Sequence, residues 1–160
     1  VIAEVNGVAT AAGCQLVASC DLAFASDSSK FATPGVNIGL FCSTPMVALS
    51  RNVSKKEAMK MLLTGDWVSA QEAKRISLIN DHFSEDQLKE AVIKIASKIS
   101  AKSQIAVKIG KQAFYDQYEM SLSDAYVFTS RVMTENSLKN EAKEGISAFL
   151  DKRHPKWLDN

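Results

Sequence analysis

A very short helix between two apolar strands constrains the fold of this chain more than any other feature. Val1–Val5 has the composition of a buried strand, and Asn6–Gly7 forms a turn signal after it. The small apolar residues of Ala11–Ser19 predict a short, tightly packed helix, and Asp21–Ala25 predicts a second strand. A strand–helix–strand crossover of this kind favours a parallel pair, so the sequence predicts an α/β fold.

The rest of the chain predicts few further strands and many helices. We expect short strands at Lys30–Ala32 and Leu78–Phe83, and a structured loop over Thr33–Thr44, which holds proline and glycine. Apolar residues then recur at helical spacing, with serine at several predicted helix starts. The expected helices begin after Ser54, Ser69, Ser84 and Ser121, and also cover 106–114 and 140–150.

Composition excludes several classes of protein. The 160 residues suffice for one ordinary domain, with 46% apolar and 23% charged residues. Nineteen Lys and Arg against eighteen Asp and Glu leave a formal charge of +1, so we expect no nucleic-acid partner. There is no apolar run of about 18 residues, so no membrane span is expected. Three cysteines without a CxxC pair argue against a disulfide framework and a zinc site, and we expect no metal.

The predicted strands are too few for the predicted helices. The chain opens on Val1 rather than Met and enters a strand at once. Three strands cannot form a complete sheet beneath so many helices. We therefore expect this chain to be part of a longer protein whose N-terminal strands are missing.

The first candidate functional site is the start of the helix predicted over Ala11–Ser19. The amides of a helix N-terminus are free and lie at the positive end of the dipole, so they can stabilise negative charge on a thioester or carboxyl oxygen. Small residues at Ala11, Ala12 and Gly13 would let a substrate approach the backbone. The same small residues also suit close packing of the helix on a strand, and spacing alone does not decide between the two.

Three motifs resemble one family of enzymes. They are VIAEVNGVATAAGCQLVASCDLAFAS, LTGDWVSAQEAKRISLIN and EGISAFLDKRHPKW, which follow one another in the order found in the crotonase, or enoyl-CoA hydratase/isomerase, superfamily. The resemblance implies a crotonase (ClpP-like) fold. It also implies that residues 1–83 are the C-terminal part of the α/β core and 84–160 a C-terminal helical region for oligomerisation.

The family's acid/base positions hold neutral residues in this chain. Hydratases of the family add water to a 2-enoyl thioester with two glutamates, and the resemblance places Gln15 and Gly35 at their positions. Ser43 occupies a third position, which carries aspartate in some family members. The resemblance assigns Ala12 a backbone amide of the oxyanion hole, which needs no particular side chain. Because an amide side chain cannot exchange a proton at neutral pH, we expect weak or absent hydratase activity.

Two residues near the C-terminus match family contacts to coenzyme A. These are Phe149 and Lys152 in EGISAFLDKR. A lysine can pair with a phosphate, and a phenylalanine can lie against the acyl chain or the adenine. The resemblance thus implies an acyl-CoA ligand in fatty acid metabolism, no other cofactor, and a homo-oligomer, either a trimer or a hexamer.

Two further questions stay open at this point. The run FATPGVNIGLFCSTP is similar to one branch of the family whose animal members are mitochondrial, so we expect the mitochondrial matrix, with a bacterial cytoplasm as the alternative. The protein is either an acyl-CoA-binding enzyme or a non-catalytic module with an assembly or regulatory role. Among the other reactive side chains, Cys14 is either filler or a nucleophile, and Asn37 either a loop residue or a ligand contact.

Overall fold

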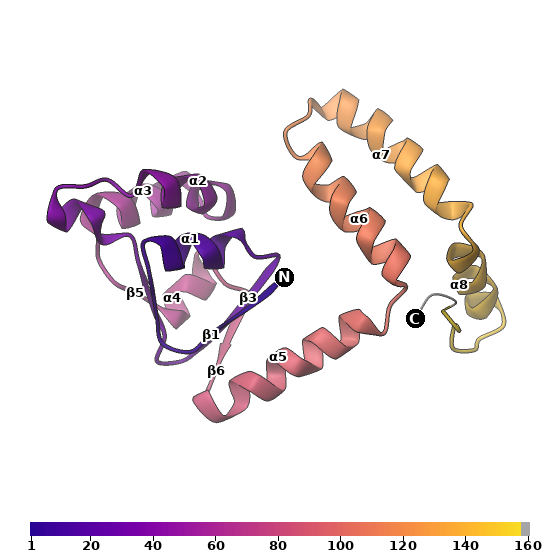
Figure 1. The fold of residues 1–160 in the computed structure, drawn as a ribbon, viewed down its shortest axis with the longest axis horizontal. Coiled ribbons are helices and arrows are strands. Elements are labelled where there is room, and N and C mark those ends of the chain that lie inside the picture. The colour runs from indigo at the N-terminus through magenta and orange to yellow at the C-terminus, as the bar shows by residue number, and fades with distance from the viewer. Residues whose placement is uncertain (158–160) are drawn as a thin grey trace. The chain divides into compact units, whose positions relative to one another are not determined.

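The computed structural model describes residues 1–157, which form two compact units (Figure 1). The first unit is Val1–Ala96 and the second begins at Ser97, within one long helix. Strands occur only in the first unit among the described residues. The boundary between 83 and 84 that the family resemblance implies stays a prediction.

The first sheet of the first unit is entirely parallel. It has the order β1 (Ile2–Val5), β3 (Leu22–Ser26) and β6 (Asp81–Phe83). Helix α1 (Ala12–Ser19) lies between β1 and β3 in the sequence, and Ile2 pairs with Leu22 in parallel register. The predicted parallel pair and its short helix are confirmed.

A second small sheet contains two strands that the sequence did not predict. Its order is β2 (Val8–Thr10), β4 (Lys30–Ala32) and β5 (Val68–Ser69), with β2 and β4 parallel and β5 antiparallel to β4. Residues 1–157 thus hold six strands rather than three or four. Strands of two or three residues are too short to show an alternating pattern, so sequence analysis missed β2 and β5.

One predicted strand is shorter than expected. Leu78 and Ile79 are buried, yet they belong to the turn after a helix, because both amides donate to the carbonyl oxygen of Ala73, at 2.8 and 3.3 Å. The strand starts only at Asp81. A short apolar run was therefore misread as strand where it fills the core from a turn.

Four helical segments lie between β4 and β6 in the sequence. They are the 3₁₀ helix η1 (Pro34–Ile38) and the helices α2 (Ser43–Asn52), α3 (Lys55–Thr64) and α4 (Ala70–Arg75). Ser54 and Ser69 cap α3 and α4 as predicted, since their hydroxyls accept the N–H groups of Glu57 and Glu72. Helix α2 was expected to be partly loop, and it buries only Pro45 and Leu49.

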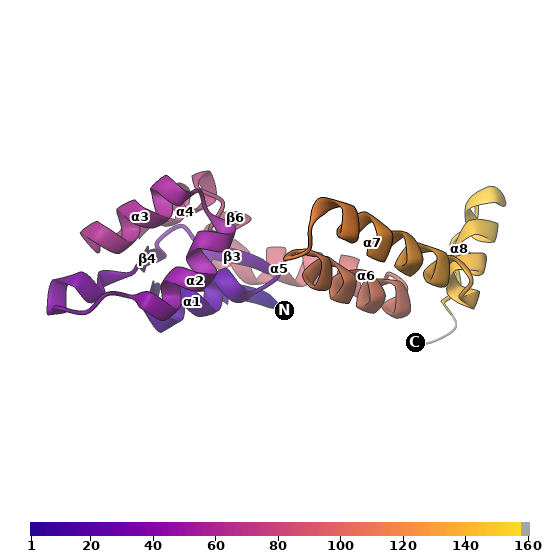
Figure 2. The same cartoon turned by 90° about the horizontal axis from the view of Figure 1, so that it is seen from above.

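The second unit is helical, and its elements are seen from another side in Figure 2. Helix α5 (Glu85–Ser100) runs into it and is followed by α6 (Gln104–Gln117), α7 (Leu122–Ser137) and α8 (Asn140–Leu150). The predicted helices are confirmed. None of the helices in residues 1–157 is long and apolar enough to cross a membrane.

The second unit buries little of its apolar surface. Helix α7 has no buried residue, and its large hydrophobic side chains Leu122, Tyr126 and Met133 are exposed. The few buried groups include two polar ones, Ser103 and Glu141, and the Ser103 hydroxyl donates to the Glu141 carboxylate. A unit with so small a core depends strongly on each buried contact.

Ser103→Ala should destabilise the protein by about 2 kcal/mol, because Ser103 both caps α6 through the Ala106 N–H, at 3.1 Å, and bonds the buried Glu141 carboxylate. Chemical denaturation measures the loss. Ser121→Ala is the matched control, because Ser121 caps α7 and bonds the Asp124 carboxylate at the surface, where the loss should cost about 1 kcal/mol. Equal losses in the two variants would show that burial of the contact with Glu141 adds nothing.

Candidate functional site

Strands β2 and β4 bring two distant segments to one edge of their sheet. The strands are parallel, and their last residues, Thr10 and Ala32, are register partners. The chain leaves β2 into α1 and leaves β4 into η1, so both segments start from the same edge. The Ala11 N–H donates to the Ala32 carbonyl oxygen at 3.0 Å and fastens them together.

The start of α1 has an unusual backbone conformation. Ala11 precedes the helix with φ 46° and ψ −113°, a region that glycine adopts freely and alanine rarely. Ala12 is the first helical residue, it is exposed, and its amide has no acceptor inside its own helix. This backbone amide is accessible to an oxygen atom of a ligand. The oxyanion-hole role that the family resemblance implies for Ala12 stays a prediction.

Gln15 lies one turn into α1. Its amide donates to the Ala11 carbonyl oxygen at 3.0 Å, and its own carbonyl accepts the Ser19 hydroxyl at 2.8 Å. The residue is half-buried, and its side chain carries no charge at any ordinary pH. It can hold a polar group by hydrogen bonding, but it cannot act as a general base.

Gly35 has no room for a side chain. A Cβ atom at this position would lie 2.7 Å from the Leu40 carbonyl oxygen and 2.9 Å from the Cys42 sulfur. The loop closes on itself here, because Leu40 donates to the Gly35 carbonyl at 2.9 Å and Gly35 donates to the Cys42 sulfur at 3.3 Å. The obstacle is steric contact, since φ of Gly35 is not positive.

The other side of the same loop rests on the end of α3. Gly65 closes α3 in the left-handed conformation, with φ 65°. A Cβ atom there would lie 3.1 Å from Pro34 Cα, 3.1 Å from Asn37 Nδ2 and 3.2 Å from Val36 Cγ2. The segment around Gly35 therefore has close neighbours on two sides, Leu40 and Cys42 on one and the end of α3 on the other.

The third acid/base position is also neutral. Ser43 begins α2, is exposed, and donates its hydroxyl to the Phe41 carbonyl oxygen at 3.3 Å. Ser43 thus offers no carboxylate at this edge.

Two other reactive side chains, Cys14 and His82, are protonated or paired. Cys14 is 1% exposed, and burial, helped by the nearby Cys42, raises the pKa of its thiol to about 11. It therefore stays protonated, and the nucleophile reading of Cys14 is not supported. His82 lies at the end of the other sheet, where its Nδ1 is 2.5 Å from an Asp27 carboxylate oxygen.

The two predicted coenzyme A residues lie in the second unit. Phe149 is near the end of α8 and is 82% exposed, and Lys152 follows that helix, also exposed. Both side chains are accessible to a ligand. Their contact with coenzyme A stays a prediction.

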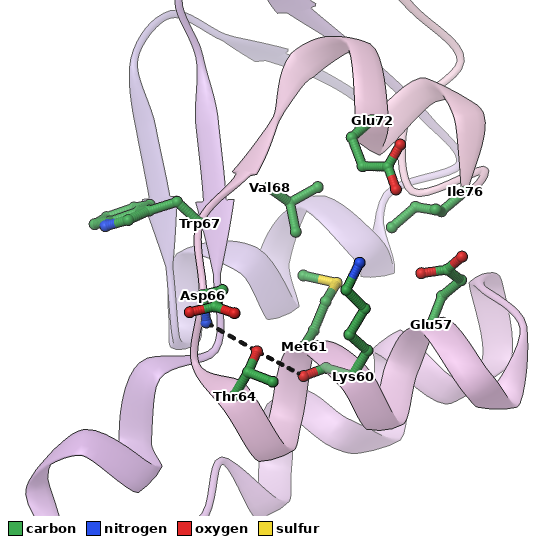
Figure 3. Close-up of a pocket in the computed structure, with 9 residues that line it drawn as sticks. All are labelled: Glu57, Lys60, Met61, Thr64, Asp66, Trp67, Val68, Glu72 and Ile76. Carbon is green, nitrogen blue, oxygen red and sulfur yellow. Dashed lines mark hydrogen bonds between the residues drawn. The ribbon is translucent and has the colours of Figure 1, made fainter.

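One pocket of the first unit was not predicted from the sequence (Figure 3). It is a cavity of about 160 Å³ between α3 and α4, with Met61, Val68 and Ile76 among its apolar lining. The Thr64 hydroxyl donates to the Lys60 carbonyl at 2.8 Å and accepts the Asp66 N–H at 3.2 Å, as the dashed lines show.

The acidic groups of this pocket also serve the fold. Glu57 and Glu72 each bond the Arg75 guanidinium at 2.6 Å, and this pairing lowers the pKa of Glu72. None of the candidate catalytic or coenzyme A residues named in the sequence analysis lines this pocket.

The fold and the edge formed by β2 and β4 define a protein of the crotonase class. The Enoyl-CoA hydratase/isomerase family model matches residues 1–160, and the chain belongs to this family. Solved structures support the fold. The chain matches an enoyl-CoA hydratase of Mycobacterium smegmatis with a TM-score of 0.96 and 51% identity, over 98% of this chain and 61% of that one. The predicted crotonase fold is confirmed.

Similar curated proteins carry one shared name. Rat enoyl-CoA hydratase domain-containing protein 3, mitochondrial, is 55% identical over 98% of this chain and 52% of its own length. The human protein of that name is 54% identical over the same shares of the two chains. The solved human structure has a TM-score of 0.95 to this chain, with 54% identity over 98% of this chain and 62% of that one. The chain thus spans about half the length of these curated relatives.

Gly35→Ala should destabilise the protein by about 1–3 kcal/mol, the usual cost of overpacking, because a methyl group would meet the Leu40 backbone and the Cys42 sulfur. Thermal unfolding checks the loss. Gly110→Ala is the control, since no atom lies within 4 Å of a Cβ there and the helix should gain stability. A neutral Gly35→Ala variant would mean that the loop can open.

Proposed function

We propose that this protein binds acyl-CoA thioesters and does not hydrate them at a useful rate. The observation that carries the proposal is the closed loop at Gly35, where a side chain would lie 2.7 Å from a backbone oxygen. Together with the neutral Gln15, it leaves both glutamate positions without a carboxylate. General acid/base catalysis contributes about 10²–10⁴-fold for each group, so the loss of both is severe.

The groups that would bind the ligand are retained in this proposal. The Ala12 amide polarises the thioester carbonyl, which draws negative charge onto the oxygen. Lys152 pairs with a phosphate of coenzyme A, and Phe149 covers part of the ligand. Their exposure and the family match support these roles.

The wider setting of the protein follows the same family. The rat and human proteins named above are mitochondrial by name, which supports the mitochondrial matrix and a role in fatty acid metabolism. The exposed apolar residues of α6 to α8 support a homo-oligomer, a trimer or a hexamer. The alternative is a non-catalytic module for assembly or regulation, which the neutral Gln15 and Gly35 favour equally.

The full-length protein should hydrate crotonyl-CoA at least about 10⁴-fold more slowly than a relative with two glutamates, because no residue at either position takes or gives a proton. The loss of enoyl absorbance measures the rate. Gln15→Glu alone should gain little, and adding Gly35→Glu should fail to restore activity, since the loop excludes that side chain.

Fast hydration by the unmodified protein, preserved in Gln15→Ala, would overturn this proposal. It would mean that a different residue activates the water. A rate restored by the double variant would instead show that the loop around Gly35 rearranges, and would leave the loss of the carboxylates as the whole cause.

Lys152→Ala in the full-length protein should weaken coenzyme A binding by about 1–2 kcal/mol, the scale of a partly solvated charge-assisted contact. Titration calorimetry with coenzyme A tests this. Lys139→Ala is the control, because it removes an exposed lysine from the same unit that the site does not use. No binding by the unmodified protein would favour the assembly or regulatory module.

A further inference from the structure

The turn that carries Lys152 has a conformation that normally selects glycine. Lys152 has φ 52°, in the left-handed region, directly after the C-cap residue Asp151. Its amide donates to the Phe149 carbonyl at 3.2 Å, and the Arg153 amide donates to the Ala148 carbonyl at 3.0 Å. These two bonds are those of a Schellman motif, whose left-handed residue is most often glycine. Lysine occupies this position at a conformational cost, which suggests that its side chain has a use.

A carboxylate on α8 fastens the segment after this turn. Glu144 Oε1 lies 2.7 Å from Arg153 Nη1, and Oε2 lies 3.0 Å from Arg153 Nη2, so the guanidinium is held in a two-point contact. The same Oε1 also accepts the Lys156 amide at 2.7 Å. The Glu144 side chain thus bonds the chain at Arg153, directly after Lys152, and again at Lys156.

A second contact fastens the same segment farther along. The Trp157 indole N–H donates to the Ala101 carbonyl oxygen at 2.9 Å. The indole ring lies over Gly145, where a Cβ atom would be 3.4 Å from the ring. The turn at Lys152 is therefore fixed by α8 before it and by two anchored residues after it.

We propose that Glu144 is a positioning residue, which orders Arg153 and so presents the Lys152 ammonium to the anionic part of a coenzyme A ligand. This inference rests on the proposed function. Glu144 itself does not touch the ligand. It reduces the freedom that the turn would lose on binding, which is the general advantage of a preorganised contact.

The direction in which Glu144→Gln changes the affinity for coenzyme A separates a positioning role from an effect of charge alone. Glu144→Gln removes a negative charge beside a region that binds an anion, so charge alone would strengthen coenzyme A binding. Loss of positioning weakens it. We expect the dissociation constant for coenzyme A to rise about fivefold in titration calorimetry with the full-length protein, at a temperature well below unfolding. Glu135→Gln, an exposed glutamate on α7, is the charge-matched control and should not weaken binding.

A second variant keeps the inference testable if Glu144→Gln does not fold. Arg153→Lys keeps the positive charge but loses the two-point contact, and should also weaken binding. Unchanged or tighter binding in either folded variant would overturn the positioning role.

A pair of variants at Lys152 tests the conformational cost. Lys152→Gly and Lys152→Ala should lose coenzyme A affinity to the same extent, while only Lys152→Gly should raise the melting temperature, because glycine fits the left-handed turn. Equal melting temperatures for the two variants would overturn the claim that lysine is held there at a cost. Failure of Lys152→Ala to weaken binding would remove Lys152 from the proposed function. Weaker binding in Lys152→Ala with tighter binding in Glu144→Gln would overturn the positioning role alone.

Discussion

The hydrogen bond from the Ala11 amide to the Ala32 carbonyl joins the two segments of the first unit that carry candidate site residues. It ties the end of β2 to the end of β4, and so sets the start of α1 beside the start of η1. Parallel pairing makes this possible, because parallel strands end at the same edge of a sheet. Ala12 and Gln15 lie in one of these segments and Gly35 in the other, so this edge brings together parts of the chain that are about twenty residues apart in the sequence.

Sequence analysis found the elements whose signal is local. The serine caps at Ser54, Ser69 and Ser121 were predictable, since one hydroxyl and one backbone amide decide each of them. Strands β2 and β5 were not, because they are held by pairing with β4 rather than by a pattern of their own. The buried turn at Leu78 and Ile79 was mistaken for a strand because an apolar run predicts burial, and burial alone does not say how the backbone is hydrogen-bonded.

The candidate site divides along a similar line. The family motifs were enough to select Gln15, Gly35 and Lys152 as candidate site residues, because a motif gives the type of each residue and its order in the chain. The closed loop around Gly35 did not, because it depends on Leu40 and Cys42 folding back onto it and on Gly65 behind it. Sequence could say that the carboxylate is absent from this position. Only the packing says that the loop has no place for one.

Two non-glycine residues have a backbone conformation that favours glycine, and one glycine stands where the backbone conformation does not require it. Ala11 and Lys152 have positive φ, where glycine would fit with less strain, while Gly35 has ordinary φ but no space for a side chain. A strained residue persists only where the surrounding contacts determine its conformation. At Ala11 the bond to Ala32 supplies them, and at Lys152 the Schellman bonds and the Glu144–Arg153 pair do. Contacts of the backbone therefore fix the conformation at Ala11 and at Lys152, whereas packing of the loop fills the space next to Gly35. Under the proposed function, the first two positions serve binding, and the third explains why a carboxylate is missing.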